Sequence, residues 1–142
     1  MPTDVRILQE TDRAVLSNVA ADVFDDPIDG AACREFLGDP RHRLAVAIDA
    51  GVVVGFASGV ICLHPDKPRP ELWINEVGVA SSHRGQGIGR RLIEVMLDAG
   101  RAAQCRDAWV LTDRSNNAAM RLYAAAGGEG SSDHVMFTFS LN

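Results

Sequence analysis

The segment from Arg84 to Arg91 combines glycine, arginine and the start of a helical pattern. Gly85, Gly87 and Gly89 alternate with other residues within it. Glycine has no Cβ and adopts positive φ, so a ligand can come close to its main chain. A helix N-terminus offers unpaired N–H groups and a partial positive charge. Together these features predict an anion site, most naturally for phosphate. Arginines at a helix start oppose the helix dipole, and a bound anion would remove that cost.

Three phosphate-binding motifs are alternatives for this segment, as is a glycine-rich turn without a ligand. A Walker A loop requires a Gly-Lys-Ser/Thr ending, which is missing here. A dinucleotide fingerprint requires Gly-x-Gly-x-x-Gly early in a βαβ unit, whereas these evenly spaced glycines follow the middle of the predicted sheet. The third motif is a loop that holds the diphosphate of an acyl carrier.

The composition is that of one globular domain, which we expect to cover residues 1–142. Its 142 residues, 46% of them hydrophobic, can bury a single core. No apolar run approaches the length of a membrane span, and the N-terminal "MPTDVRILQE" lacks a signal sequence, so we expect no membrane association. The net charge of −5 disfavours a nucleic-acid partner. It suits a cationic substrate, or serves solubility alone.

The three cysteines are odd in number and far apart: Cys33, Cys62 and Cys105. This spacing argues against a disulfide framework and against a zinc site. We therefore expect free thiols in a cytoplasmic protein that binds no metal.

The hydrophobic pattern predicts an α+β fold with a mixed sheet that contains an antiparallel meander. Strands are predicted over 5–8, 44–49, 52–61, 71–79, 108–112 and 134–141. Helices are predicted from residue 12 to 23 and over 31–39, 87–103 and 116–127. A hairpin is predicted around residues 49–51, and the proline-rich stretch 64–70 is predicted to be a loop.

The strand before the glycines changes its apolar parity. Leu72 and Ile74 share one parity, and Val77 and Val79 share the other. A regular strand keeps its apolar face on one parity, so the switch predicts a β-bulge near residues 75–76. The alternative is a strand buried on both faces, where parity has no meaning.

The chain resembles the GNAT N-acetyltransferases at two motifs that occur in the family's order. Arg84, Gly87 and Gly89 fill the pattern Arg/Gln-x-x-Gly-x-Gly/Ala after a bulged strand. The pattern Asn-x-x-Ala-x-x-Leu-Tyr-x-x-x-Gly is filled by Asn116, Ala119, Leu122, Tyr123 and Gly127. One departure is Gly128, where the family often has Phe. The resemblance covers nearly the whole chain and implies a mostly antiparallel sheet with a bulged central strand, helices on both faces, and acetyl-CoA as cosubstrate.

The resemblance also implies how the cosubstrate is held. Loop amides would bind the diphosphate, a neighbouring strand backbone would pair with the pantetheine arm, and a bulge amide would polarise the thioester carbonyl. The cosubstrate-binding residues so implied are Val77, Val79, Arg84, Gly85, Gln86, Gly87, Ile88, Gly89, Arg90, Asn116 and Ala119.

Two side chains are candidates for proton transfer. Tyr123 matches the family position that protonates the leaving thiolate, and a pKa near 10 suits that role. The alternative for Tyr123 is core packing with a hydrated hydroxyl. Glu76 lies in an apolar strand, where a carboxylate is costly without a task, so we expect it to act as base or to position the amine. The alternative for Glu76 is a structural carboxylate satisfied by backbone or arginine.

The acceptor is suggested by a narrower similarity. The segments 69–79 and 21–27 look similar to those of the type I aminoglycoside 3-N-acetyltransferases, although Glu76 stands where aspartate is usual. This implies direct attack by the 3-amino group of an aminoglycoside. An acidic rim would then hold the polycation; its members would be Asp22, Asp25, Asp26, Glu71, Glu76, Glu129 and Asp133. The alternative is a set of solvated loop charges.

Two further functions stay open. One is a GNAT enzyme for another small amine, an amino acid or a protein amine. The other is a non-catalytic CoA-binding regulatory domain, which would need neither Tyr123 nor Glu76. Family members are often dimers, so we expect a homodimer in which the final strand, 134–141, pairs across a two-fold axis.

Overall fold

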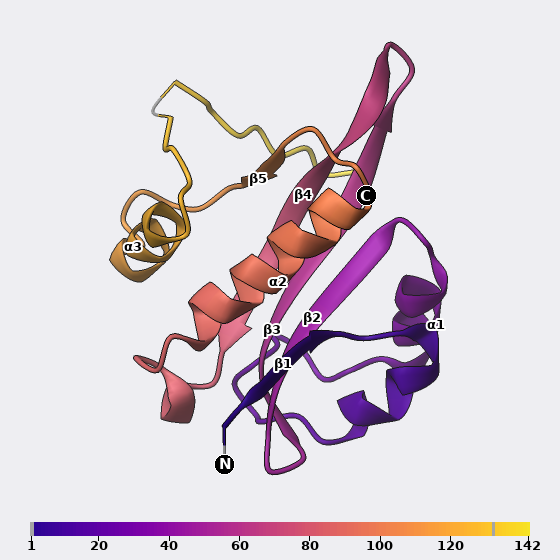
Figure 1. Cartoon of the computed structure of the whole chain (residues 1–142), viewed down its shortest axis with the longest axis vertical. Helices are drawn as coiled ribbons and strands as arrows, with labels where there is room; N and C mark the ends of the chain where they lie inside the picture. The colour runs from indigo at the N-terminus through magenta and orange to yellow at the C-terminus, as the bar shows by residue number, and fades with distance from the viewer. Residues whose placement is uncertain (1, 132) are drawn as a thin grey trace.

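Among residues 2–131 and 133–142, which the computed structural model describes, five strands form one open sheet flanked by helices (Figure 1). The strands lie in the order β1-β2-β3-β4-β5. The elements in chain order are β1 (Asp4–Ile7), η1 (Glu10–Ser17), α1 (Gly30–Gly38), β2 (His42–Asp49), β3 (Val52–His64), β4 (Lys67–Val79), η2 (Ser81–His83), α2 (Ile88–Ala102), β5 (Ala108–Val110) and α3 (Asn117–Ala125).

The sheet is mixed and mostly antiparallel, which confirms the predicted fold class. β1 to β4 pair with their neighbours antiparallel, and β5 joins β4 in parallel. The chain crosses from β4 to β5 through α2, as a parallel connection requires. None of the helices in the described ranges combines the length and the apolar character needed to span a bilayer.

The core lies between α2 and the sheet. Leu72, Leu92 and Met96 are completely buried there. Two glycines allow the close approach: a Cβ at Gly59 would lie 3.1 Å from the Leu72 and Met96 side chains, and one at Gly100 would lie 3.0 Å from Leu72. On the opposite face η1 and α1 cover β2 and β3, so helices flank both faces of the sheet (Figure 1).

The predicted β-bulge in β4 is confirmed. Ser58 of β3 lies opposite Glu76, whereas the next residue, Gly59, lies opposite Ile74. Asn75 is therefore the extra residue of the bulge. This insertion explains the parity switch, because it moves Val77 onto the same face as Ile74.

Beyond the bulge, β4 and β5 part. β5 pairs only with residues 72–74 of β4, whereas β3 accompanies β4 as far as Val79. Within the described residues, the main chain of β4 over 75–79 therefore has no strand on its β5 side. A ligand in extended conformation could pair with this backbone as an added strand would.

The sequence analysis was wrong about the connection over residues 64–70. β3 continues to His64 and β4 begins at Lys67, so the two strands form a long hairpin with a tight turn. Pro68 and Pro70 lie inside β4, next to a register irregularity between Cys62 and His64. Proline is tolerated in a strand at such an irregularity because fewer ladder hydrogen bonds need its missing N–H.

The first predicted helix is shorter than expected and has 3-10 geometry. It ends at Ser17, and Val19 instead forms an isolated parallel bridge with Val53. This bridge draws the chain into an extended course and prevents a continuous helix to residue 23. Leu16 and Val23 are nevertheless buried, so part of the predicted apolar face does reach the core.

The predicted final strand over 134–141 does not form in the described residues. The last strand is β5, and residues 133–142 have no regular secondary structure. A strand requires a hydrogen-bonded neighbour, and β5 pairs only with β4. β5 is also shorter than predicted, ending at Val110.

Candidate active site

The loop between η2 and α2 presents main-chain groups rather than side chains. Gly85 and Gly87 have φ of 77° and 78°, in the left-handed region that favours glycine. A Cβ at either position would meet no heavy atom within 4 Å, so open space lies beside both. Gly87 is the N-cap of α2, and no side chain caps that helix start. The first amides of α2 are therefore available to an anion.

Two side-chain tethers hold this loop in place. The Asp22 carboxylate accepts a hydrogen bond from the Ser81 backbone N–H at 2.9 Å. The hydrogen bonds from Ser81, helped by the charge of Arg84, keep the pKa of Asp22 below its usual value of 3.8. On the other side, His83 Nε2 lies 2.7 Å from Asp49 Oδ2 at the end of β2. The loop is thus fixed to two distant parts of the chain. Asp22, predicted as a member of the acidic rim, forms this contact instead and does not line the cleft described below.

The remaining residues of the loop have separate surroundings. Arg84 Nε donates to the Val79 carbonyl at 3.3 Å, and Arg90 pairs with Glu94 at 3.0 Å. Ile88 is buried, so only its main chain can face a ligand. A Cβ at Gly89 would lie 3.2 Å from Leu122 of α3, so this glycine allows α2 and α3 to pack closely.

α3 lies beside α2 on the side where β5 parts from β4 (Figure 1). Asn116 is its N-cap, and the Asn116 side chain accepts a hydrogen bond from the Ala119 N–H at 3.1 Å. These two residues of the second motif therefore build the helix start. Tyr123, one turn further on, packs against the core, and burial raises the pKa of its phenol above 10. The phenol therefore keeps its proton at neutral pH.

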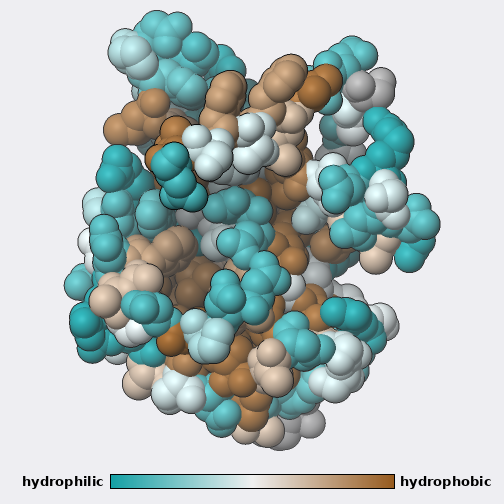
Figure 2. Space-filling view, turned by 180° about the vertical axis from the view of Figure 1, so that it is seen from behind, coloured by the Kyte–Doolittle hydropathy of each residue, from teal (hydrophilic) through white to brown (hydrophobic). Residues whose placement is uncertain are grey.

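A cleft of about 640 Å³ opens on the sheet face opposite α2. Figure 2 views this face and shows apolar side chains exposed in hollows between polar patches. Phe24, Phe36 and Phe56 supply apolar walls, and Phe24 stacks on Phe56 with ring centroids 4.0 Å apart. The walls come from the loop over residues 24–29 and from α1, β2, β3 and β4.

Three of the predicted acidic residues meet in this cleft: Asp25, Asp26 and Glu76. Glu76 is exposed to it, so the strand carries this carboxylate without the desolvation cost that the sequence suggested. Asp29 also lines the cleft, but its carboxylate caps α1 by accepting from the Ala32 N–H at 2.9 Å. Asp29 was not predicted; its position before a helix signals a cap rather than a site.

The other predicted acidic residues do not line the cleft. Glu71 has its side chain 3.1 Å from His64 Nε2, although the ring N–H is not aimed for a hydrogen bond. Arg106 also approaches Glu71, at 3.9 Å. Glu129 and Asp133 are exposed residues that follow α3.

Two further residues of the cleft were missed by the sequence analysis. His42 lines it, stacks at a tilt against Phe36, and has a buried Nδ1 without a hydrogen-bond partner among the described residues. Trp73 also lines the cleft and stacks on Trp109 of β5, with ring centroids 5.2 Å apart. Neither has a motif around it, since each reaches the cleft only through the pairing of strands.

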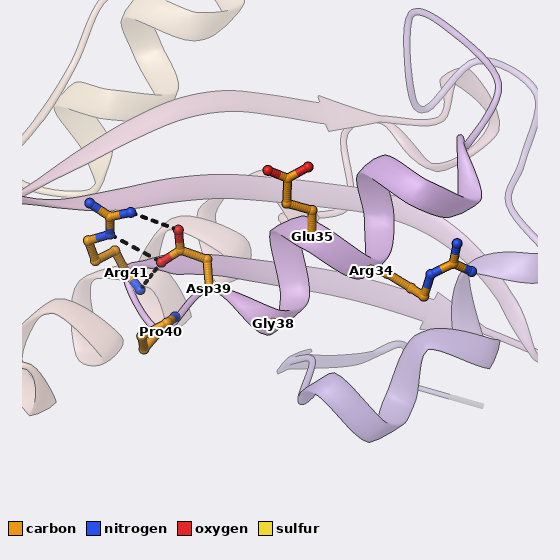
Figure 3. A pocket seen from close by; sticks show the side chains of 6 residues that line it. All are labelled: Arg34, Glu35, Gly38, Asp39, Pro40 and Arg41. Atoms are coloured by element: carbon orange, nitrogen blue, oxygen red, sulfur yellow. Dashed lines mark hydrogen bonds and ion pairs between the residues drawn. The ribbon is translucent and has the colours of Figure 1, made fainter.

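A second depression, of about 580 Å³, lies where α1 meets β2 (Figure 3). Asp39 and Arg41 bond to each other there, with Arg41 Nε and Nη2 at 3.2 and 3.0 Å from the carboxylate oxygens. Figure 3 shows Arg34 and Glu35 pointing away from this pair and from each other. Because its charged groups do not converge, this depression is not a candidate active site.

The chain belongs to the Acetyltransferase (GNAT) family, whose sequence profile it matches over residues 9–127. It is 30% identical over 128 residues to N-alpha-acetyltransferase RimI of Mycobacterium tuberculosis (strain ATCC 25618 / H37Rv), covering 89% of this chain and 78% of the relative. It is 27% identical over 103 residues to N-acetyltransferase 8 of Rattus norvegicus, covering 72% of this chain and 46% of that protein. It is therefore a GNAT N-acetyltransferase, and this family uses acetyl-CoA as acyl donor.

Solved structures show the same fold. An aminoglycoside acetyltransferase, meta-AAC0020, from an uncultured soil metagenomic sample superposes with a TM-score of 0.82 at 19% identity, covering 99% of this chain and 97% of that one. Aminoglycoside N-acetyltransferase AAC(6')-Iy in complex with CoA superposes with a TM-score of 0.79 at 21% identity, covering 99% and 96%. At these identities the likeness concerns the fold alone.

The residues present fit acetyl-CoA. Open space beside Gly85 and Gly87, an uncapped start of α2 and the unpaired backbone of β4 together suit a diphosphate followed by an extended arm.

Proposed function

We propose that this enzyme acetylates a primary amine of a polycationic small molecule, and that in its most specific form the acceptor is an aminoglycoside acetylated at its 3-amino group. The observation that carries this proposal is the position of Asp25, Asp26 and Glu76 in one cleft at the bulge of β4. Carboxylates attract a polyamine and bind it through charge-assisted hydrogen bonds. Acetylation of such an antibiotic would confer resistance.

The donor would lie along residues 75–79 and the loop over 84–89. Bound acetyl-CoA supplies an acetyl group activated as a thioester. The backbone of Val77 and Val79 would orient the pantetheine arm. The amides of Gly85 to Gly89 would hold the diphosphate, with assistance from Arg84, Gln86 and Arg90. A bulge amide would polarise the acetyl carbonyl.

Proton transfer would use one residue on each side of the acetyl group. The acceptor nitrogen, as a neutral amine, attacks the carbonyl carbon; a C–N bond forms and the C–S bond breaks. Glu76 accepts the proton lost by the amine, directly or through water, and Tyr123 donates a proton to the departing sulfur. The raised pKa of Tyr123 supports this role, because the donor form is kept.

Direct attack is supported by the state of the one thiol in the cleft. Cys33 lines it, but burial raises the pKa of this thiol, so the nucleophilic thiolate is disfavoured. A covalent acyl-enzyme on Cys33 would need that thiolate.

A protein or peptide amine is a second candidate acceptor. It is favoured by the identity of 30% to a relative named N-alpha-acetyltransferase, which is higher than the identity to the aminoglycoside enzymes above. Other small amines and amino acids fit the same acidic cleft. A non-catalytic CoA-binding role is disfavoured, since it requires neither Tyr123 nor Glu76.

An acceptor screen separates these candidates. CoA thiol release from acetyl-CoA is measured with 2-deoxystreptamine aminoglycosides, linear polyamines, diamino acids and peptides with a free N-terminus. We expect the highest kcat/KM with an aminoglycoside and a product acetylated at the 3-amino group, as located by NMR. A peptide as the preferred acceptor would establish the second candidate instead.

Removing two carboxylates tests how the acceptor is held. We expect Asp25→Asn with Asp26→Asn to raise the KM for a polycationic acceptor about tenfold and to weaken its dependence on ionic strength, because charge-assisted contacts are lost. The KM for acetyl-CoA should not change. Asp98→Asn is the matched control, since this residue is exposed on α2 and pairs with Arg101. An unchanged acceptor KM would contradict the acidic-rim proposal.

We also propose that the enzyme works in the cytoplasm as a homodimer. All three cysteines are free thiols, as expected in a reducing compartment.

A further inference from the structure

Two pairs of stacked rings lie on the sheet face that forms the cleft. Trp73 of β4 stacks on Trp109 of β5, with ring centroids 5.2 Å apart and an angle of 11° between the ring planes. His42 of β2 stacks at a tilt on Phe36 of α1, with ring centroids 4.7 Å apart. Trp73, His42 and Phe36 line the cleft. Each pair therefore brings at least one ring to the cleft surface.

Strand register places the two pairs on either side of Val60. His42 is the cross-strand partner of Val60 where β2 pairs with β3, and Val60 is the partner of Trp73 where β3 pairs with β4. Trp109 is in turn the partner of Trp73 on β5. Cross-strand partners point to the same face of a sheet, so these residues form one row across it. Since neighbouring strands lie about 4.8 Å apart, His42 and Trp73 are separated by about 10 Å.

The row leaves a slot above Val60. The nearly parallel stack with Trp109 covers the indole of Trp73 on the β5 side, so its other face is turned toward β3. Val60 lines the cleft and is much smaller than the rings on either side of it. Stacked rings prefer centroids about 4.5 to 7 Å apart, so a separation of about 10 Å accommodates one ligand ring between Trp73 and His42.

A carboxylate lies next to this slot. Glu76 is the cross-strand partner of Ser58, which precedes Val60 by two residues on β3. Residues two apart in a strand point to the same face and lie about 7 Å apart. Glu76 and Trp73 therefore share the cleft face, and a ring seated on Trp73 would bring an amine on its rim within reach of Glu76. The indole face also attracts the ammonium groups of such a ligand.

We propose that this slot holds the ring that carries the acceptor amine, and that Trp73 makes the enzyme select ring-bearing amines, such as aminocyclitols and amino sugars, over linear polyamines. The apolar C–H face of the ring would pack on the indole, and its ammonium groups would face Asp25, Asp26 and Glu76. A linear polyamine satisfies the same carboxylates but has no flat face to cover the indole. The inference rests on the proposed function, because it takes the cleft as the acceptor site.

The fluorescence of Trp73 tests where the ring lies. The chain has two tryptophans, so Trp109→Phe leaves Trp73 as the only one and keeps a ring behind it. With saturating CoA present, this variant is titrated with neamine, a ring-bearing tetraamine, and with spermine, a linear tetraamine. We expect neamine to change the emission of Trp73 in a saturable way and spermine to leave it nearly unchanged. An equal response to both amines would overturn the proposal.

Turnover measured with the same two amines separates this proposal from the proposed function. Acetylation of neamine without a change in Trp73 emission would overturn the slot and leave the proposed function standing. A saturable change in emission without acetylation would leave the ring site standing and overturn the proposed acceptor. If neamine causes neither, both proposals are overturned.

Two substitutions of Trp73 test selectivity. Trp73→Phe keeps an aromatic face, whereas Trp73→Leu keeps only apolar bulk. We expect the ratio of kcat/KM for neamine to that for spermine to fall about tenfold in Trp73→Leu and to change by less than about twofold in Trp73→Phe. A role in packing alone would lower kcat/KM for both amines in the same proportion. An unchanged ratio in Trp73→Leu would therefore overturn the proposal.

Discussion

The proposed donor side and the proposed acceptor cleft of this enzyme are built in different ways. The donor side consists of one nearly continuous stretch, from the bulge of β4 at Asn75 to the first turn of α2, and it presents main-chain groups. The cleft is lined by side chains from a loop, two helices and three strands. A site made of main chain depends on backbone conformation, whereas a site made of side chains depends on their identities. Substitutions should therefore have different consequences on the two sides.

The largest effect is expected at Tyr123, the proposed proton donor to the leaving thiolate. Tyr123→Phe should lower kcat about 100-fold or more, because one general acid is lost, while the KM for acetyl-CoA should stay nearly constant. Since burial raises the pKa of this phenol, the wild-type rate should not fall at alkaline pH until the pH exceeds 10. Steady-state kinetics between about pH 6 and about pH 11, a range that includes the usual pKa of a phenol, are the measurement. Unchanged turnover in the variant would remove Tyr123 from proton transfer.

The next effect is expected at Glu76. Glu76→Gln should lower kcat at neutral pH by roughly 10- to 100-fold and recover partly at alkaline pH, where the amine loses its proton unaided. Glu35→Gln, exposed on α1, is the matched control. A loss of equal size at every pH would indicate that Glu76 binds the acceptor and is not a base.

A glycine pair tests the main-chain account of the donor side. Gly87→Ala and Gly51→Ala both force an alanine into a left-handed conformation with open space around it. Each should lose about 1 kcal/mol of stability. We expect only Gly87→Ala to weaken acetyl-CoA binding, by about tenfold, in a calorimetric titration. Equal affinities of the two variants for acetyl-CoA would contradict the proposal that the donor side binds through its main chain.

The smallest effect concerns the tether of the donor loop. Asp22→Ala removes the acceptor of the Ser81 N–H and should raise the Kd for acetyl-CoA about fivefold, because the loop loses one of its two tethers. The pKa of Asp22 is lowered, so the tether should hold at neutral pH and be lost only as the pH falls below 3.8. Asp12→Ala is the control, because its carboxylate accepts from the Gln9 N–H at the same 2.9 Å, away from the loop. Equal Kd values for both variants would contradict the tether.

The difference between a site made of main chain and a site made of side chains also explains which parts of the candidate site could be predicted from the sequence. The bulge at Asn75 and the start of α2 at Gly87 depend on residues close in the chain, and both could be found from parity and glycine spacing. Glu76 could be singled out because it lies inside that stretch, and its role in proton transfer stays a prediction. His42 and Trp73 enter the cleft through strand register, which no local pattern contains.

Two regions were predicted wrongly for related reasons. The stretch 64–70 looked like a loop because of its prolines, yet hairpin pairing with β3 carries β4 through them. Residues 134–141 have the alternation of a strand, but alternation cannot supply a hydrogen-bonded neighbour. In both cases, whether the segment formed a strand depended on the presence of a neighbouring strand to pair with.

The central claim is that the main chain of residues 84–89 and of β4 beyond its bulge binds acetyl-CoA. It is tested most directly by titrating acetyl-CoA into the protein labelled with 15N and following the backbone amides by NMR. The account predicts the largest shifts at the amides from Arg84 to Gly89 and from Glu76 to Val79, with small shifts in the cleft loop at Asp25 and Asp26. Shifts concentrated in the cleft, or none over residues 84–89, would contradict it.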